Sequence, residues 1–331
     1  MAQINPVLGD LDGNVQRIVD AAREAASAGA DVLLTPELSL CGYPPEDLLF
    51  RPAFLEACTA ALERLAKRLA EWPSLRVVVG HPFSPFSPSS PDIQRTRSVS
   101  TWRCFNSASV LAEGRVLARY DKRELPNYQV FDERRYFQSG REAGRDAVVF
   151  EAAGCRFGVL ICEDAWFDEP AAHARAAGAQ VLLVLNASPF HLGKIAEREA
   201  RMAAQARASG CALLYAQLCG GQDEVVFDGG SFAVDARGEV KARAPLFVES
   251  MLRVELQAGG RLHGDLHPIP ALEDQAWQAL VCGVRDYIGK NGFPGVLLGL
   301  SGGVDSALVL AVAVDALGAD RVRTVMMPSP Y

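Results

Sequence analysis

The 331-residue sequence lacks several features that would place it in a specialised class of protein. It has no long apolar run, because stretches such as Val181–Leu185 and Val296–Leu300 are far shorter than the roughly 20 residues that cross a bilayer. It has no basic excess either: its formal net charge is −7, whereas proteins that bind a phosphate backbone carry clustered Lys and Arg. We therefore expect neither a membrane nor a nucleic acid as a partner.

The cysteines and histidines lack a metal-binding pattern. The eight cysteines include no C-x-x-C pair and stand in apolar surroundings, which predicts mostly buried, reduced thiols. Among the five histidines, His263 and His267 have the spacing of metal ligands, but no cysteine or acidic cluster accompanies them. We predict no metal site within these residues.

The amino-terminal segment MAQINPVLGD lacks the basic start and long apolar stretch of a secretory signal. The expected location is therefore the cytoplasm. The segment also begins almost inside the first expected strand, so we expect this start to be trimmed or misassigned.

Short β-branched or Leu-rich runs alternate with Ala-rich stretches of helical period, which indicates an α/β architecture. This order favours a mixed sheet with helices on its faces. The Pro- and Ser-rich stretch from Ser84 to Ser98 predicts an exposed loop. The pattern predicts helices over 12–30, 54–71 and 195–208, strands over 31–35, 75–80 and 181–185, and hairpins over 104–120 and 147–161.

A change of pattern after residue 256 indicates a domain boundary. We predict a first domain over 1–256, a linker over 257–270 with Gly259 and Gly260, and a second unit over 271–331. That unit reads as a helix, a strand, a glycine-bearing turn, a second helix and the strand Val322–Met326. About 60 residues are too few for a stable core of their own, so we expect a domain that is cut short.

Three chemically capable side chains each follow a predicted strand: Glu37, Lys122 and Cys162. Ligands bind at strand ends in open α/β sheets, so these side chains can converge in one pocket. A thiol, whose free pKa is roughly 8.5, is a weak nucleophile until a base such as Glu37 takes its proton. Lys122 and the backbone N–H after Cys162 are suited to stabilise the oxyanion of an attacked carbonyl. Taken one at a time, the cysteine is also typical of a buried thiol, and the glutamate and lysine of solvated charges. The hypothesis of a catalytic pocket therefore depends on the combination of the three.

The segments that carry these residues resemble one known superfamily in order and context. TPELSLCGYPPEDL, YDKRELPNYQVFDERRYF and GVLICEDAW are similar to the motifs of the Glu-Lys-Cys triad of the nitrilase, or carbon–nitrogen hydrolase, superfamily. Glu133 matches an additional glutamate of that superfamily, and the resemblance covers residues 1 to about 255. It implies a four-layer αββα nitrilase-like sandwich, amide hydrolysis through a thioester and no cofactor for this domain. Because such sandwiches usually pair back to back, we also expect a homo-oligomer.

Two finer segments, GYPPEDLL and NASPFHLGK, look like the glutaminase domains of the glutamine-dependent NAD synthetase family. The resemblance implies that Ser188 and Lys194 hold the α-amino and α-carboxylate end of glutamine. It also implies a pocket lined by Tyr128, Glu163 and Trp166. Ser188 has a second possible role as a helix N-cap before a proline. Lys194 stands where some members have Arg, and it offers a point charge in place of a bidentate fork.

The sequence SGGVDS, residues 301–306, follows a predicted strand and opens a predicted helix. Glycines allow a close backbone approach, and the free N–H groups and dipole at a helix start favour an anion. The segment matches neither G-x-x-x-x-G-K-[ST] nor G-x-G-x-x-G. It therefore predicts a pyrophosphate-binding loop of a different kind.

This loop resembles the signature of ATP-pyrophosphatases, and the continuation VMMPSPY is similar to NAD synthetases. The resemblance implies the beginning of a Rossmann-like ATP-pyrophosphatase α/β domain, with ATP and Mg²⁺ as a substrate complex and deamido-NAD as the acceptor. The residues that contact the ATP phosphates would be Ser301, Gly302, Gly303, Asp305 and Ser306.

Three other interpretations stay open at this point. The first is a free-standing amidase of the same superfamily, which would have no use for SGGVDS. The second is another glutamine-dependent amidotransferase that keeps the loop but has a different acceptor. The third is a catalytically silent scaffold, which a glutamine-like electrophile would not label.

Overall fold

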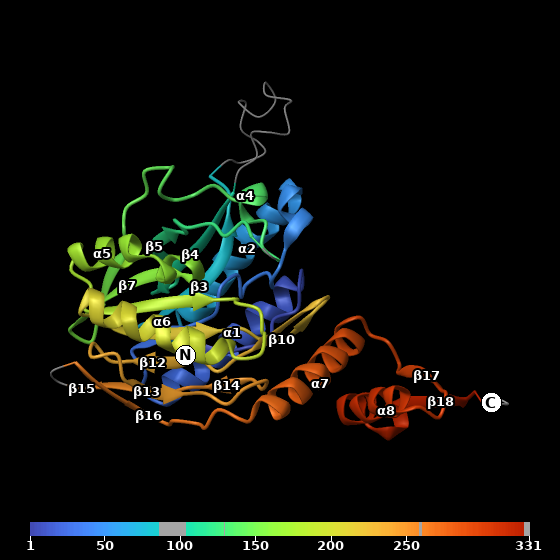
Figure 1. Ribbon diagram of the computed structural model, residues 1–331. Helices are drawn as coiled ribbons and strands as arrows, with labels where there is room; N and C mark the ends of the chain where they lie inside the picture. Colours follow the sequence, from blue (N-terminus) through green and yellow to red (C-terminus); the bar gives the residue numbers. More distant parts are fainter. Residues whose placement is uncertain (86–103, 129, 258–259, 328–331) are drawn as a thin grey trace.

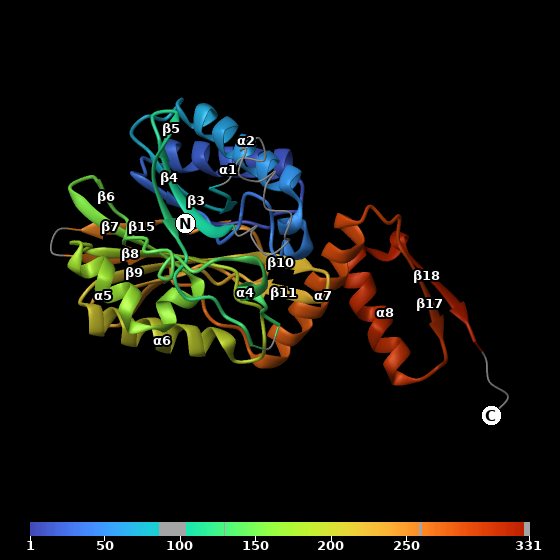
Figure 2. The same cartoon turned by 90° about the horizontal axis from the view of Figure 1, so that it is seen from above.

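The computed structural model describes residues 1–85, 104–128, 130–257 and 260–327. Two β-sheets lie face to face between two layers of helices, and a smaller unit of helices and strands projects to one side (Figure 1, Figure 2). This arrangement confirms the predicted α/β class and the αββα sandwich. The residue pattern alone favoured a single mixed sheet, and this was wrong, because the predicted strands divide between two sheets.

The first sheet has the strand order β2-β3-β4-β5, with β2 and β3 parallel and the other pairs antiparallel. Its strands are β2 (Val32–Leu34), β3 (Arg76–Phe83), β4 (Phe105–Ala112) and β5 (Arg115–Asp121). Helices α1 (Leu11–Ser27) and α2 (Pro52–Leu69) cover its outer face (Figure 2). Both helices bury an apolar stripe of helical period, which explains why the sequence pattern located them. Of the predicted loop, residues 86–98 lie outside the described part of the chain.

The second sheet has the order β13-β12-β9-β8-β7-β6, and its central strands β7, β8 and β9 run parallel. Its strands are β6 (Val149–Ala152), β7 (Cys155–Ile161), β8 (Val181–Asn186), β9 (Ala212–Gln217), β12 (Phe232–Val234) and β13 (Val240–Arg243). Strand β8 is buried along its whole length, as expected for a parallel strand covered on both faces. Helices α5 (Asp168–Ala176) and α6 (Lys194–Ser209) cover the outer face of this sheet (Figure 2).

Shorter elements complete the sandwich. Three antiparallel pairs are β1 (Ala2–Gln3) with β14 (Ser250–Met251), β10 (Cys219–Gln222) with β11 (Val225–Asp228), and β15 (Val254–Gln257) with β16 (Arg261–Gly264). Three short helices follow strands or loops: η1 (Glu46–Phe50), α4 (Glu133–Tyr136) and η3 (Cys162–Trp166).

The range 257–270, which the sequence suggested as a linker, is not wholly a linker. Strand β16 lies within it, pairs with β15 and contacts β13, so a boundary after residue 256 divides a hairpin. The glycines that suggested a linker precede β16, and Gly260 has a φ of +77°, a conformation that favours glycine. The remaining domain boundaries stay predictions.

The carboxy-terminal unit consists of α7 (Leu272–Lys290), β17 (Val296–Leu300), α8 (Val304–Leu317), η4 (Ala319–Arg321) and β18 (Val322–Met326). Strands β17 and β18 are parallel and are joined through α8, as predicted for a βαβ unit. Helix α7 packs on β10 and β11, where Lys290 Nζ donates to Pro6 O (3.1 Å) and Gly221 O (2.7 Å). Of the helices in the described ranges, none has the length and apolar character to span a membrane.

Candidate active site

Glu37 follows β2 and is buried between the two sheets, with a side chain that is 1% exposed. Its Oε1 accepts hydrogen bonds from Lys122 Nζ and from Asn106 Nδ2, both at 2.7 Å. Its Oε2 accepts from the backbone N–H of Ala187, at the end of β8, at 3.0 Å. The carboxylate is thus held from strands of both sheets.

The turn that carries Glu37 packs tightly against β3. Leu38 has a φ of +49°, and a Cβ on Gly80 would lie 2.4 Å from Leu38 N. No side chain fits there, so glycine is required for the close approach of the two backbones. This contact fixes the direction in which Glu37 leaves the turn.

Lys122 follows β5 and is completely buried, at 0% exposure. Its backbone N–H donates to Asn106 O (2.8 Å), and its ammonium donates to Glu37 Oε1 (2.7 Å) and Glu133 Oε1 (2.8 Å). Burial lowers the pKa of Lys122, but the charges of Glu133 and Glu37 outweigh it and raise the pKa well above its ordinary range. The ammonium is therefore permanently charged near neutral pH.

Glu133 opens α4 and faces the same ammonium. Burial raises the pKa of its carboxyl to about 7, with Lys122 opposing and Glu37 adding to the shift. Within the described part of the chain, its Oε2 is buried and has no hydrogen-bond partner. A buried oxygen without a hydrogen-bond donor lowers the stability of the fold. Its presence therefore indicates that Glu133 has a role other than stabilising the protein.

Cys162 follows β7 at the first residue of η3, with a φ of +45°. Its residue is 4% exposed. Burial raises the pKa of the thiol well above its ordinary value, and the charge of Glu37 raises it further, whereas Lys122 lowers it. The resting group is therefore a thiol, which needs a base at the moment of attack.

Asp164 ties the Cys162 turn to the Lys122 strand. Its Oδ2 accepts from Tyr120 OH (2.8 Å) and Ile161 N (3.1 Å). Its Oδ1 accepts from the backbone N–H groups of Arg123 (3.0 Å) and Glu124 (2.8 Å). Burial raises the pKa of Asp164 to about 6, while the hydrogen bond from Glu124 N lowers it. One carboxylate thus fixes the residues that flank both Cys162 and Lys122.

The predicted pocket residues lie around this centre in two pairs. Tyr128 OH donates to Glu163, with both oxygens at 3.0 Å, and Lys194 Nζ lies 4.6 Å from the ring centre of Trp166. The pKa of Glu163 is raised, mainly by burial, and the charge of Lys194 lowers it, so the two pairs are within electrostatic reach.

Ser188 lies next to Ala187, whose N–H contacts Glu37, and its residue is 6% exposed. The alternative that it caps a helix is wrong for α6, because Gly193 occupies that N-cap. Lys194 Nζ also contacts Glu197 Oε2 at 3.1 Å. An exposed partner of this kind is weakly bound and can be exchanged for a ligand carboxylate.

A cavity reaches Glu133 from the side of η1 and β11. Its lining is mostly aromatic, proline and aliphatic, and it includes Tyr43, Pro44, Phe131, Phe137, Pro189 and Val225. The lining also includes three acidic residues, Glu46, Asp132 and Glu133, so the cavity combines an apolar wall with carboxylates.

The residues of the predicted phosphate loop stand apart from this centre, between β17 and α8. Gly302 has a φ of +87°, and Ser306 Oγ donates to Gly303 O at 3.0 Å. Ser301 Oγ lies 3.3 Å from Ser306 Oγ. Asp305 is exposed in the first turn of α8, so the loop is open to solvent.

Sequence reasoning missed Asn106 and Asp164, which contact the centre or its flanking residues, and Arg198, which donates to Ser188 O at 2.7 Å. Asn106 is a polar residue within a buried strand, and Arg198 lies on the apolar stripe of α6 with Ile195 and Met202. A charge on an apolar stripe, or an amide in a buried strand, is a signal that could have been used. Asp164 stood in the quoted segment GVLICEDAW without a role.

The arrangement supports nucleophilic attack on a carbonyl. Two N–H bonds of the Lys122 ammonium go to carboxylates, which leaves a third that no described residue accepts. Oε1 of Glu37 already has two donors, so Oε2 is the better placed acceptor for a thiol proton. The first N–H groups of η3 provide further donors for an oxyanion. Among the described residues, no three His, Cys, Asp or Glu side chains form a metal-binding group.

Comparison with known proteins agrees with this chemistry. The family model for carbon–nitrogen hydrolases matches residues 1–261, and the model for NAD synthase matches residues 276–331. A glutamine-dependent NAD(+) synthetase of Xylella fastidiosa (strain 9a5c) is 46% identical over 336 residues, covering 100% of this chain and 58% of the relative. The chain thus spans a little over half the length of this relative.

Two solved structures are similar to this chain, one over its whole length and one over three quarters of it. A glutamine-dependent NAD+ synthetase of Acinetobacter baumannii, in complex with adenosine diphosphate, has a TM-score of 0.88 at 39% identity, covering 100% of this chain and 59% of that one. An amidase of the nitrilase superfamily from Nesterenkonia has a TM-score of 0.62 at 26% identity, covering 75% of this chain and 86% of that one.

Proposed function

Because the chain belongs to the carbon–nitrogen hydrolase family, we propose that it hydrolyses glutamine and supplies ammonia to an ATP-dependent synthesis of NAD. In this proposal the sandwich is the glutaminase, and the unit after it is the start of the synthetase. The similarity of the whole chain to glutamine-dependent NAD(+) synthetases supports it.

In the proposed reaction, Cys162 Sγ forms a bond to the side-chain carbonyl carbon of glutamine while its proton moves to Glu37 Oε2. The third N–H of Lys122 and the N–H that follows Cys162 stabilise the oxyanion. Glu37 then passes the proton to the amide nitrogen, the C–N bond breaks, and ammonia leaves a thioester on Cys162. Water attacks this thioester, gives a proton back through Glu37 to sulfur, and glutamate is released.

The specificity for glutamine would come from its charged end. Ser188 and Lys194 would bind the α-amino and α-carboxylate groups, beside Tyr128, Glu163 and Trp166. The carboxylate–ammonium contact between Glu197 and Lys194 is compatible with this role, because its exposed carboxylate can give way to the substrate.

The second unit would bind ATP with Mg²⁺ as a substrate complex. Ser301, Gly302, Gly303, Asp305 and Ser306 present hydroxyls, a carboxylate and a helix start, a chemistry that fits a pyrophosphate with its metal ion. In the complete synthesis, ATP adenylates the nicotinate carboxyl of deamido-NAD and releases pyrophosphate. Ammonia then displaces AMP and forms the amide of NAD.

One observation carries the proposal: a buried lysine ammonium bonded to two carboxylates, with a buried thiol within their electrostatic reach. The test is to incubate the chain with glutamine, without ATP, and to measure glutamate and ammonia. Diazo-oxo-norleucine, a glutamine-like electrophile, is expected to label Cys162 and to stop the release. Neither turnover nor labelling in the folded chain would overturn the proposal.

Two of the three alternatives predict a different result in this assay. The third, another glutamine-dependent amidotransferase, would hydrolyse glutamine as well and is tested by ammonia transfer to deamido-NAD in a protein with the complete synthetase unit. A free-standing amidase is disfavoured by the match of residues 276–331 to NAD synthase. It would hydrolyse small amides faster than glutamine, so the two substrates are compared in the same assay. A silent scaffold would hydrolyse neither. The expected homo-oligomer and the cytoplasmic location stay predictions.

A further inference from the structure

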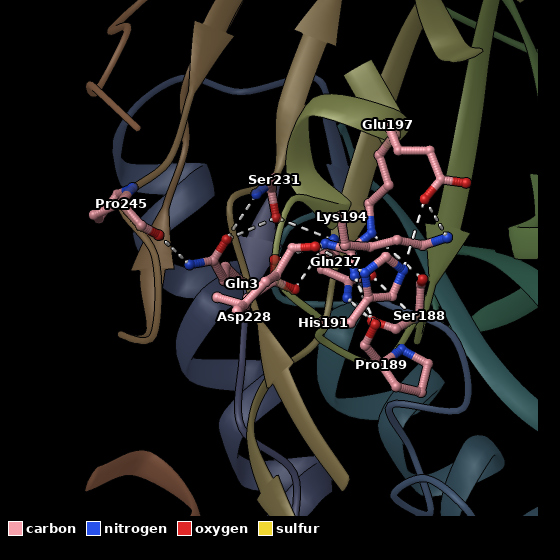
Figure 3. Close-up of polar contacts among 12 residues, drawn as sticks. Gln3, Ser188, Pro189, His191, Lys194, Glu197, Gln217, Asp228, Ser231 and Pro245 are labelled. Carbon is pink, nitrogen blue, oxygen red and sulfur yellow. Dashed lines mark hydrogen bonds and ion pairs between the residues drawn. The ribbon is translucent and has the colours of Figure 1, made fainter. Parts of the chain in front are cut away.

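The segment formed by Ala187, Ser188 and Pro189, which follows β8, is held by buried side chains of two other elements. Figure 3 shows Ser188 and Pro189 beside Gln217, one of these side chains. Arg198 Nη2 on α6 donates to Ser188 O (2.7 Å) and Pro189 O (3.2 Å). Gln217 on β9 accepts from Ser188 N (3.2 Å) and donates to Ser188 O. The backbone of this segment therefore has little freedom to shift.

Arg198 is itself anchored deep in the protein. Its Nη1 contacts both oxygens of Asp228, at 2.7 and 2.8 Å, and both side chains are 1% exposed. Burying two charges costs several kcal/mol per ion unless their geometry and further hydrogen bonds compensate. An apolar pair would often serve stability equally well, so stability alone does not explain this one.

The second holding residue, Gln217, is connected to Gln3 in the amino-terminal strand by a chain of hydrogen bonds (Figure 3). Gln217 N donates to Ser231 Oγ (3.0 Å), and Ser231 Oγ donates to Gln3 Oε1 (2.9 Å). Gln3 Nε2 in turn donates to Pro245 O (2.8 Å). This polar network links the segment, through Gln217 and Ser231, to Gln3 near the amino terminus.

The held segment touches the reaction centre through Ala187, and its Ser188 hydroxyl is contacted by Arg198. Ala187 N donates to Glu37 Oε2 at 3.0 Å, and Ser188 Oγ lies 3.4 Å from Arg198 Nε. We propose that Arg198 is a positioning residue for the glutaminase reaction. It fixes Ala187 and Ser188 so that one backbone N–H orients the general base and one hydroxyl meets the substrate.

This inference rests on the proposed glutaminase function, and its test uses a matched pair of substitutions. Arg198→Lys keeps a charge for Asp228 but cannot also reach the carbonyls of Ser188 and Pro189. Arg243→Lys is the control. Arg243 also pairs with a carboxylate through two contacts, to Glu199 at 2.6 and 3.0 Å, and donates to a backbone carbonyl, without contact to the triad.

The two variants are compared by steady-state kinetics with glutamine as substrate. The number of active sites in each preparation is determined by labelling Cys162 with diazo-oxo-norleucine. Arg198→Lys is expected to lower kcat/KM by about 100-fold, because small displacements of reacting groups have effects of that size. We expect kcat to fall, through Glu37, and KM to rise, through Ser188. Arg243→Lys is expected to lower the melting temperature without a change in kcat or KM per labelled site.

If Arg198 has a purely structural role, both variants should have a lower melting temperature and wild-type kcat and KM per labelled site. This result would overturn the proposal. If Arg198→Lys does not fold, the double variant Arg198→Met with Asp228→Leu replaces it, because apolar pairs of similar size are tolerated in place of buried ion pairs. A folded double variant with wild-type kcat and KM would equally overturn it.

Failure of the proposed function is recognised separately. If the wild-type chain neither releases glutamate nor is labelled at Cys162, the glutaminase assignment fails before any variant is compared. If the wild type is active, the kinetics of the two lysine variants decide the role of Arg198 alone.

Discussion

The triad and the phosphate loop are two candidate sites built in opposite ways. Lys122, Glu37 and Cys162 are buried to 4% exposure or less, and the two ionic groups each contact several polar partners. The loop between β17 and α8 is open, and Val304 at the start of α8 is 80% exposed. Its hydroxyls contact one another and the backbone of the loop.

The difference concerns preorganisation. In the sandwich, the packing of two sheets holds donors and acceptors before any substrate arrives, and such prior arrangement is what gives electrostatic catalysis its strength. In this chain, which spans 58% of the length of its relative, the loop presents its backbone N–H groups and hydroxyls to solvent, and its contacts are within the loop itself. Changes in the triad are therefore expected to affect rate, and changes in the loop to affect affinity.

The largest effect is expected for Cys162→Ala, which removes the nucleophile. Glutamate release should fall by about 10⁴-fold or more, because the remaining groups do not form a thioester. The measurement is glutamate release per mole of folded chain. Cys155→Ala, at a partly exposed thiol outside the centre, is the control and should keep full activity. Retained turnover in Cys162→Ala would contradict the assignment, and in a protein with the complete synthetase unit we expect ammonium-dependent synthesis to survive.

A smaller effect, on stability, is expected for Asp164→Asn. The amide nitrogen would face N–H donors where the carboxylate oxygen now accepts them, so the free energy of unfolding should fall by about 3 kcal/mol. Urea unfolding measures it.

The control for this change is Asp235→Asn. Asp235 also accepts two backbone N–H groups, from Arg237 and Glu239, but in a surface turn, where its side chain is 14% exposed and faces Lys241, so water can reach the freed N–H groups. Its loss should stay below about 1 kcal/mol. If the two variants lose equal free energy of unfolding, the burial of Asp164 does not contribute to the effect of its substitution.

A pH-dependent effect is expected for Glu133→Gln. The pKa of Glu133 is raised to about 7 in the folded chain, mainly by burial, whereas an unfolded glutamate ionises near pH 4.5. The folded state therefore holds this proton more tightly, and its stabilising contribution is complete at low pH and is lost as pH rises from about 4.5 to 7.

A glutamine side chain has no carboxyl proton and does not ionise in this pH range. The variant therefore does not lose stability through ionisation at this position as the pH rises. Relative to wild type, Glu133→Gln should gain stability between pH 5 and pH 8, by on the order of 1–3 kcal/mol. Thermal unfolding of both proteins across this range measures the difference. A difference that is constant with pH, or that falls, would contradict the shifted pKa of Glu133.

The sequence predicted the elements of this fold better than their assembly. Strand Val322–Met326 and the hairpin over 104–120 were located correctly because each has a strong local signal. The division of strands into two sheets has no local signal, since it depends on pairing between distant segments. Only the resemblance to a known superfamily supplied it.

The site shows the same limit. Glu37, Lys122 and Cys162 could be proposed from the sequence because they stand after strands in recognisable segments. Asn106 and Arg198 act through hydrogen bonds to residues far away in the chain, and no spacing in the sequence reveals such contacts. Local pattern indicated the groups that we propose to react, whereas the groups that contact them required coordinates.

The smallest effect is expected in the loop, for Gly302→Ala. Gly302 has a φ of +87°, so an alanine there is strained by roughly 1–2 kcal/mol, and ATP binding should weaken about tenfold as the loop adjusts. Gly292→Ala is the control, because Gly292 has a φ of +69° with an equally open Cβ direction, outside the loop. It should cost similar stability and leave the Kd for ATP unchanged in equilibrium dialysis. Glutamine hydrolysis should stay within twofold of wild type in both variants, since neither touches the triad. If Gly302→Ala alone loses glutamine hydrolysis, the exposed loop and the buried triad are coupled and do not act as separate sites.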